Sequence, residues 1–306
     1  MHYTKHALTY DQQLELLLVR GLAIPDRDRA LHWLKRKGYF RLSAYFLPFK
    51  IAGTDDYTPG SSFTDIIKLY KFDAHLRLLI IKAIDRVEIA LRTSVTYHFA
   101  HVIGRFGYTD ATNFTAFIPS SGAGVSPKGF DHAQFMRRIE NEITSSTELF
   151  VTHYRTRYNL EPHLPIWMLT ELMSFGQLSR MTEGCKKSLR KQIGRDFDLS
   201  QSKLTSWMET LTYIRNLCAH HSRIWNREVS LKPELLDEWK QAGISNTRIY
   251  CVLLVLAHLL HYASPRSRWK DMLMLCIFKN PQVDLGAMGF PADWLNCSPW
   301  NVSALR

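Results

Sequence analysis

The segment from Phe63 to about Val102 constrains the fold more than any other part of this 306-residue chain. Apolar residues recur in it every three or four positions, and neither glycine nor proline interrupts the pattern. This spacing predicts a helix, or a closely joined pair of helices, and a rise of about 1.5 Å per residue makes it about 60 Å long. An element of that length favours a helical bundle. The recurring apolar residues are Ile66, Ile67, Leu69, Tyr70, Leu76, Leu79, Ile80, Ala83, Ile84, Val87 and Leu91.

The rest of the chain shows helical rather than strand periodicity. Thr9, followed by Gln12 three residues later, is typical of a helix N-cap, and Asp26 precedes a second short amphipathic segment. No alternation of polar and apolar residues is long enough for a sheet, so we predict an all-α protein. The aromatic stretch at residues 39–49 is expected to be helical too. Further helices are predicted at residues 131–158, 165–180, 185–194, 200–226, 247–262 and 268–278.

We expect a single domain with short connecting loops. Residues 55–62 form one predicted loop, and the Ser/Gly/Pro-rich residues 119–129 form a second, mobile one. Gly122-Ala123-Gly124 within it lacks the Gly-Lys-Ser/Thr ending of a phosphate-binding loop. The predicted domain consists of an N-terminal helical and aromatic extension at residues 1–62, a helical bundle at residues 63–280 and a C-terminal tail at residues 281–306.

The charge balance favours an anionic partner. Lys and Arg number 39 against 28 Asp and Glu, which gives a formal net charge of +11 and a pI near 9.4. Such a surplus attracts phosphate backbones, and an anionic membrane surface would satisfy it equally well. The net charge alone therefore indicates a class of partner but does not locate a binding site.

Cysteine usage and hydropathy point to the cytoplasm. The five cysteines are widely spaced and form no C-x-x-C pair, which argues against a disulfide framework and against a zinc ribbon. The most apolar stretch, residues 249–262, contains two histidines and is shorter than the roughly 20 residues of a membrane span. We interpret it as a buried helix, and we expect neither a signal peptide nor a membrane partner.

Two stripes distinguish the predicted helix at residues 200–226. An apolar stripe buries one face; it consists of Leu204, Met208, Leu211, Ile214, Cys218 and Trp225. The polar residues Asn216, His220, Arg223 and Arg227 step by four, three and four, so they are expected to share another face. Arg215 and His220 diverge by about 140° on an ideal helix, but an arginine side chain is long enough to reach round. Asn216 lies one turn below His220 and could orient its imidazole.

Arginine and histidine together suit RNA cleavage by the ribose 2′-OH. A base removes the 2′ proton, an acid protonates the leaving 5′ oxygen, and a fixed cation offsets charge on the phosphorus oxygens. Histidine titrates near neutrality, and arginine grips phosphate through two donors. One histidine leaves a second proton-transfer group to be found, and either His221 or His220 of a second copy could supply it. The spacing alone favours a polar helix face whose histidine bonds a carbonyl.

Ordered blocks along nearly the whole chain resemble the Abi-like (AbiD/AbiF) abortive-infection family of bacterial phage-resistance proteins, within the HEPN superfamily. The central block is residues 215–227, which runs from Arg215 to Arg227 through His220 and His221. The other blocks are residues 8–14, 20–22, 38–45, 63, 69–73, 76–77, 84–92, 165–168, 171, 175–176, 178–179, 288–291, 294 and 300.

This resemblance implies a HEPN-type helical bundle with additional N- and C-terminal helices, and a metal-independent Arg-x4–6-His ribonuclease motif. The matching positions here are Arg215, Asn216 and His220. It further implies paired motifs, a homodimer in this case because the chain has one good Arg-x4-His, and in some relatives an associated small non-coding RNA. We therefore predict a cytoplasmic endoribonuclease of phage defence or of a toxin–antitoxin system, without cofactor or metal.

Several further residues have two interpretations each. Glu88 and Arg92 are four residues apart, and either they form a structural ion pair or Glu88 lies in the cleft beside the motif. Other possible supporting residues are Glu171, His221 and Arg223. His258 and His261 are spaced as helical metal ligands can be, but we favour core or helix-end histidines. The aromatic stretch at residues 39–49 is core or stacks bases. The candidate contacts for an RNA backbone are Arg227, Lys186, Lys187, Arg190 and Lys191, followed by Arg195.

Two other functions remain open at this stage. One is a non-catalytic RNA-binding protein that holds a small non-coding RNA or senses phage RNA. The other is a helical interaction protein that recognises a phage component.

Overall fold

The computed structural model describes residues 2, 6–118 and 129–301, and the all-α prediction is confirmed in them. These residues form thirteen α-helices and five 3-10 helices of three residues each, with no strand. The predicted loop at residues 119–129 lies outside the described residues, except for its last glycine. The helices are α1 (Tyr10–Val19), α2 (Arg27–Lys37), α3 (Tyr39–Phe46), α4 (Phe63–Val102), α5 (His132–Ser145), α6 (Leu149–Arg157), α7 (Ile166–Leu172), α8 (Phe175–Gly184), α9 (Lys187–Arg195), α10 (Gln201–Ala219), α11 (Asp237–Gln241), α12 (Ile249–Ala263) and α13 (Trp269–Phe278).

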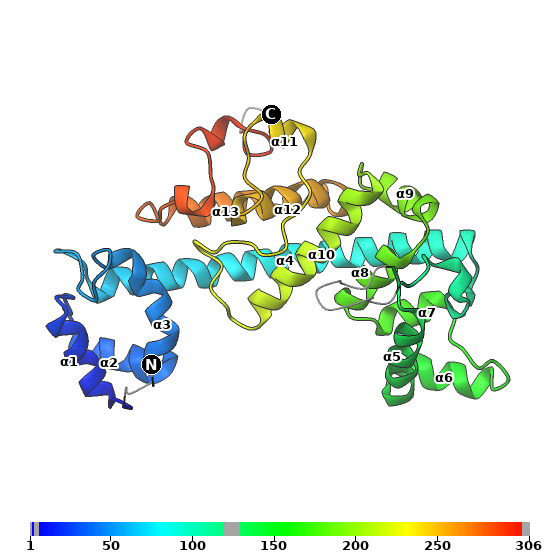
Figure 1. Cartoon of the computed structure of the whole chain (residues 1–306), viewed down its shortest axis with the longest axis horizontal. Coiled ribbons are helices and arrows are strands. Elements are labelled where there is room, and N and C mark those ends of the chain that lie inside the picture. The colour runs from blue at the N-terminus through cyan, green and yellow to red at the C-terminus, as the bar shows by residue number, and fades with distance from the viewer. Residues whose placement is uncertain (1, 3–5, 119–128, 302–306) are drawn as a thin grey trace.

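Helix α4 is the central element of the molecule and has the predicted bounds. It begins after Ser62, whose hydroxyl accepts a hydrogen bond from the Asp65 N–H, and continues for 40 residues. Helices α7, α10, α12 and α13 pack against it. Figure 1 shows α4 running along the long axis, with α1–α3 at one end and α5–α8 at the other. A single long helix thus connects all other groups of helices.

Most of the core gathers around α4 and α12. Eleven of the fifteen residues of α12 are buried, which confirms the prediction of a core helix at residues 249–262. Within the described ranges, no helix is both long and apolar enough to cross a membrane. The C-terminal segment joins this core as well, because Trp300 is buried and its indole N–H donates to the Tyr250 hydroxyl at 3.2 Å.

The helix predicted at residues 200–226 ends earlier than expected. α10 stops at Ala219, and His221 adopts a left-handed backbone conformation with φ 56°. The N–H of Ser222 donates to the Leu217 carbonyl and the N–H of His221 to the Cys218 carbonyl, which is the hydrogen-bond pattern of a Schellman C-cap. The shared face predicted for Asn216, His220, Arg223 and Arg227 is therefore wrong, because the two arginines lie beyond the helix.

Other predicted helices are divided by local caps. The segment 131–158 forms α5 and α6, which are separated by extended residues at Ser146 and Glu148. The segment 165–180 divides at Ser174, whose hydroxyl forms a capping box with Gln177 at the start of α8. α11 was not predicted, since five residues are too few to show a period. The caps at Thr9 and Asp26 are confirmed.

The aromatic stretch at residues 39–49 is helical, as expected, and mostly core. α3 is followed by a 3-10 turn at Leu47–Phe49. Leu42, Tyr45 and Phe46 are buried, whereas Phe40 is 92% exposed. The stretch therefore joins the N-terminal helices to the core and leaves one ring in solvent.

Candidate active site

The motif residues lie at the exposed C-terminal end of α10. Arg215, Asn216, His220 and His221 are all exposed. Ile214, just before them, and Cys218, among them, are buried and hold their side of the helix against the core. His220 is the C-cap residue, and its N–H donates to the Asn216 carbonyl at 2.9 Å. The helix therefore presents its polar end to solvent.

Asn216 contacts Arg215 through its side chain. One guanidinium N–H of Arg215 donates to the Asn216 amide oxygen at 3.4 Å. Within the described residues, Arg215 forms no ion pair with a carboxylate. Its other N–H donors remain open for a phosphate, which a guanidinium binds through two parallel hydrogen bonds.

The turn after His220 is held from two other helices. Arg41 of α3 donates to the His221 carbonyl at 2.8 Å, and Arg77 of α4 donates to the Ser222 carbonyl at 3.4 Å. Arg223 is half-buried and donates to the Ala44 carbonyl of α3 at 3.0 Å. Arg223 thus anchors the turn in this structure. The supporting role expected of Arg223, a contact with a neighbouring phosphate, would have to come from its remaining donors.

Asp73 of α4 is the hub of this anchorage. Its side chain is 0% exposed and accepts hydrogen bonds from the N–H groups of Ile224 at 3.0 Å and Trp225 at 2.6 Å. It also accepts the Tyr45 hydroxyl at 2.5 Å and a close ion-paired hydrogen bond from Arg77. A buried carboxylate is stable only with such partners. The network joins α3 and α4 to the segment that follows the motif.

The same network shifts the titration of its members. Burial raises the pKa of the Tyr45 hydroxyl well above its ordinary value, and the negative charge of Asp73 raises it further. Burial alone would lower the pKa of Arg77, but the charge of Asp73 together with the Tyr45 and Tyr70 hydroxyls outweighs that effect and raises it. Sequence reasoning gave these residues no role. The available signal was an Asp and an Arg four apart within an otherwise apolar stripe.

A cavity of about 480 Å³ adjoins the motif helix. Asn216, Tyr213 and Glu209 of α10 line it, opposite residues of α5 and α8 that include the exposed Arg138 and Arg180. Glu209, Tyr213, Asn216 and His220 step by four, three and four, so they share one face of α10. The cavity and the motif therefore lie along one continuous polar face.

Tyr213 is a functional candidate that sequence reasoning missed. Its hydroxyl donates to the Ser230 hydroxyl at 3.3 Å. Burial raises the pKa of the Tyr213 hydroxyl, but hydrogen bonds with Ser230 and Arg227 and the charge of Arg227 outweigh that effect and lower it. Its position three residues before Asn216 was the signal that could have found it. Arg227, which is a predicted contact for an RNA backbone, thus lies beside the Tyr213 hydroxyl. That hydroxyl can release its proton more readily than usual.

Comparison with known proteins identifies the family. A sequence model described as Abi-like protein matches residues 32–226, which is well over half of the chain. The chain belongs to the Abi-like family. None of the curated proteins and none of the solved structures compared with it matches. The Abi-like match contains all of α4 and α10, and it ends one residue before Arg227.

Glu88 and Arg92 lie within the Abi-like match and form the structural ion pair that was predicted. Their side chains are 2.8 Å apart on α4. Arg92 also donates to the carbonyls of Thr170 and Met173, the latter at 2.9 Å, at the C-terminal end of α7. The pair therefore holds α7 against α4, and none of its recorded contacts involves a residue of the motif. Glu171 is exposed on the last turn of α7.

The basic helix of this Abi-like protein lies away from the motif. Lys186, Lys187 and Lys191 are exposed on and before α9, whereas Arg190 is half-buried. α9 packs against α10 and leads into its N-terminal end, as Figure 1 shows. α10 has 19 residues and a length of about 28 Å. An RNA that contacts both sites would have to follow the whole helix.

Potential metal ligands are dispersed in the described ranges. No group of three or more His, Cys, Asp or Glu side chains there has a metal-binding arrangement. His258 is half-buried and bonds the Phe197 carbonyl at 2.8 Å, while His261 lies on the last turn of α12. The interpretation of these two as core and helix-end histidines is confirmed. All five cysteines are free thiols.

Proposed function

We propose that this Abi-like protein is a HEPN-type endoribonuclease that acts in bacterial phage defence, as an abortive-infection effector or the toxin of a toxin–antitoxin system. The observation that carries the proposal is the exposure of Arg215, Asn216 and His220 at the end of one helix, beside a cavity. The family membership supports a role in abortive infection. Five free thiols support a cytoplasmic setting.

The reaction requires groups that this end of α10 offers. In the proposed mechanism His220 exchanges a proton with the ribose 2′-OH or with the leaving 5′ oxygen, and Arg215 stabilises the charge that develops on the phosphate. Asn216 fixes the Arg215 guanidinium through its side chain and His220 through its backbone carbonyl. The 2′-OH supplies the nucleophile, so the proposed chemistry proceeds without a metal ion.

A second proton-transfer group completes the proposed site. Three candidates are His221, His220 of a second copy in a homodimer, and Tyr213. Tyr213 is supported by its place on the same face of α10 and by its lowered pKa. A second copy is supported because only one Arg-x4-His, that of Arg215 and His220, lies in the block that resembles the family motif. A twofold axis would bring two such motifs to one cleft.

The test is expression of the wild type and of an Arg215→Ala/His220→Ala double variant in a bacterium. The expected result is growth arrest and RNA fragments with 2′,3′-cyclic phosphate ends for the wild type, and neither for the double variant. His153→Ala, which replaces an exposed histidine on α6, is the matched control and should behave as the wild type. Equal toxicity and equal RNA cleavage by the double variant would contradict the enzymatic function.

A second candidate function is an RNA-binding protein that cuts nothing and holds a small non-coding RNA or senses phage RNA. The exposed Lys186, Lys187 and Lys191 favour it, since such a track binds phosphate backbones without catalysis. This function predicts salt-sensitive RNA binding that survives His220→Ala, with no cyclic phosphate ends formed by the wild type.

A further inference from the structure

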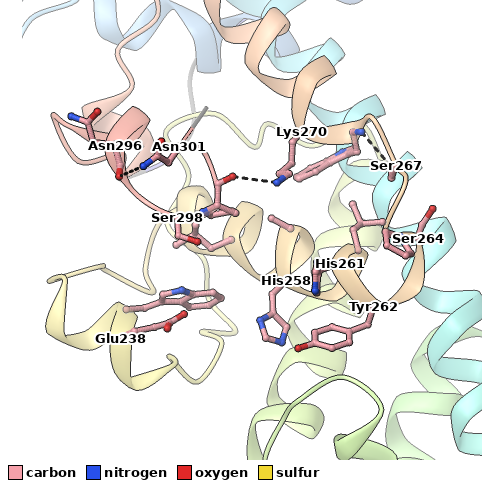
Figure 2. Close-up of a pocket in the computed structure, with 17 residues that line it drawn as sticks. Glu238, His258, His261, Tyr262, Ser264, Ser267, Lys270, Asn296, Ser298 and Asn301 are labelled. Carbon is pink, nitrogen blue, oxygen red and sulfur yellow. Dashed lines mark hydrogen bonds between the residues drawn. The ribbon is translucent and has the colours of Figure 1, made fainter. Parts of the chain in front are cut away.

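One cavity lies outside the part of the chain that matches the family. It has a volume of about 690 Å³ and is enclosed by α11, α12, the start of α13 and the turn at residues 296–301 (Figure 2). All residues that line it fall between Glu238 and Asn301, beyond the matched residues 32–226. Its volume is in the range of about 300–1,000 Å³ that is usual for pockets of small organic ligands.

One side of this cavity has hydrogen-bond donors without acidic partners. The Lys270 ammonium is half-buried, and its one recorded hydrogen bond is a long one, 3.3 Å, to the Pro299 carbonyl. An ammonium has three donors, so two of them remain. His261 projects into the same space in Figure 2 and forms no hydrogen bond within the described residues. These two side chains would satisfy an anionic group such as a phosphate.

The opposite side is aromatic and carries a carboxylate. Trp239 is mostly buried and stacks in parallel on Trp207 of α10 at 5.5 Å, and the His258 ring meets Trp207 edge-on at 5.1 Å. Glu238 is exposed next to Trp239, across the cavity from Lys270 (Figure 2). An aromatic wall suits a flat ring, and a carboxylate accepts N–H donors while it repels a phosphate. The charge distribution therefore orients a ligand that has both a ring and a phosphate.

We propose that this cavity binds a nucleoside monophosphate whose base carries an amino group. The phosphate lies at Lys270 and His261, and the base lies at Trp239 with its amino group donating to the Glu238 carboxylate. Binding here does not depend on whether the chain cleaves RNA, because none of these residues belongs to the motif at the other end of α10.

Titration calorimetry of the full chain with GMP, AMP, CMP and UMP tests the proposal. We expect saturable binding of the first three and weaker binding of UMP, whose base lacks an amino group. Lys270→Gln should weaken nucleotide binding about tenfold or more, as the loss of a charged hydrogen bond to phosphate does. Lys279→Gln, at the exposed far end of the same helix, is the matched control and should leave affinity unchanged.

Glu238→Gln tests the base side of the cavity. It should reduce the preference for amino-bearing bases over UMP and leave phosphate binding in place. The proposal is overturned if no nucleotide binds at about 1 mM, or if Lys270→Gln binds as tightly as the wild type. Inorganic phosphate that binds as tightly as the nucleotides would overturn it too, since the base would then contribute nothing.

Discussion

Tyr213 has a titration that the proposed reaction can use. It shares a face of α10 with Asn216 and His220. Burial raises the pKa of its hydroxyl, but Ser230 and Arg227 together outweigh that effect and hold the pKa below the ordinary value. If Tyr213 protonates the leaving 5′ oxygen, it must be protonated to act. The cleavage rate should then fall as pH rises through its lowered pKa.

Two substitutions separate this role from a structural one. Tyr213→Phe should remove the alkaline limb of the pH–rate profile and slow cleavage by about 10²-fold or more, the usual contribution of a general acid. Arg227→Gln removes the charge that stabilises the phenolate, which raises the pKa of Tyr213. The alkaline limb should therefore move to higher pH. An alkaline limb that stays in place in both variants would exclude Tyr213 as the acid.

At the scale of elements, the Asp73 network decides where the segment after α10 lies. Asp73→Asn would leave Arg77 buried without a counter-charge, and the loss of one partner from a buried pair costs about 3–5 kcal/mol. Urea denaturation should show that decrease in the free energy of unfolding. Tyr45→Phe, which removes one hydrogen bond to Asp73, should cost about 1–3 kcal/mol.

Asp85→Asn is the matched control, because Asp85 lies on the same helix and is exposed. Its unfolding free energy should match the wild type within about 0.5 kcal/mol. If Asp73→Asn has the same free energy of unfolding as Asp85→Asn, the network does not hold the turn after α10. In that case the position of His220 must depend on α10 alone.

Elements whose boundaries are set locally were predictable from the sequence. The apolar periodicity of α4 begins after the N-cap Ser62 and ends just before Gly104, so both ends of the helix could be predicted. The end of α10 was not predicted, because the residue that adopts the left-handed conformation there is His221 and no glycine or proline marks the position. Arg215, Asn216 and His220 were chosen because the block around them resembles the family motif, since helical spacing alone did not distinguish them from an ordinary polar face. Asp73 bonds a residue 151 positions away, a contact that a single sequence does not reveal.

Two exposed apolar side chains are sequence neighbours of the arginines that hold the turn after the motif. Phe40 is 92% exposed and precedes Arg41, which bonds the His221 carbonyl; Leu78 is 64% exposed and follows Arg77, which bonds the Ser222 carbonyl. Contiguous apolar patches rimmed by polar residues mark protein contacts. We expect a second copy to pack here. Phe40→Asp should therefore shift the chain to a monomer in light scattering and abolish cleavage.

Leu160→Asp is the control for that substitution, because Leu160 is 93% exposed but lies between α6 and α7, far from the motif (Figure 1). It should remain a dimer and remain active. A Phe40→Asp protein that is still dimeric would show that the copies meet elsewhere. A monomer that still cleaves would show that one chain holds the complete site.

Mixing two inactive variants decides whether the chains share the site. If Arg215 of one copy acts with His220 of the other, a heterodimer of Arg215→Ala and His220→Ala chains contains one intact pair. Random pairing of equal amounts makes half of the dimers heterodimers, so co-refolded chains should regain up to about a quarter of the wild-type activity. If each chain uses its own pair, every site in the mixture lacks one group. Cleavage should then stay at the level of the separate variants.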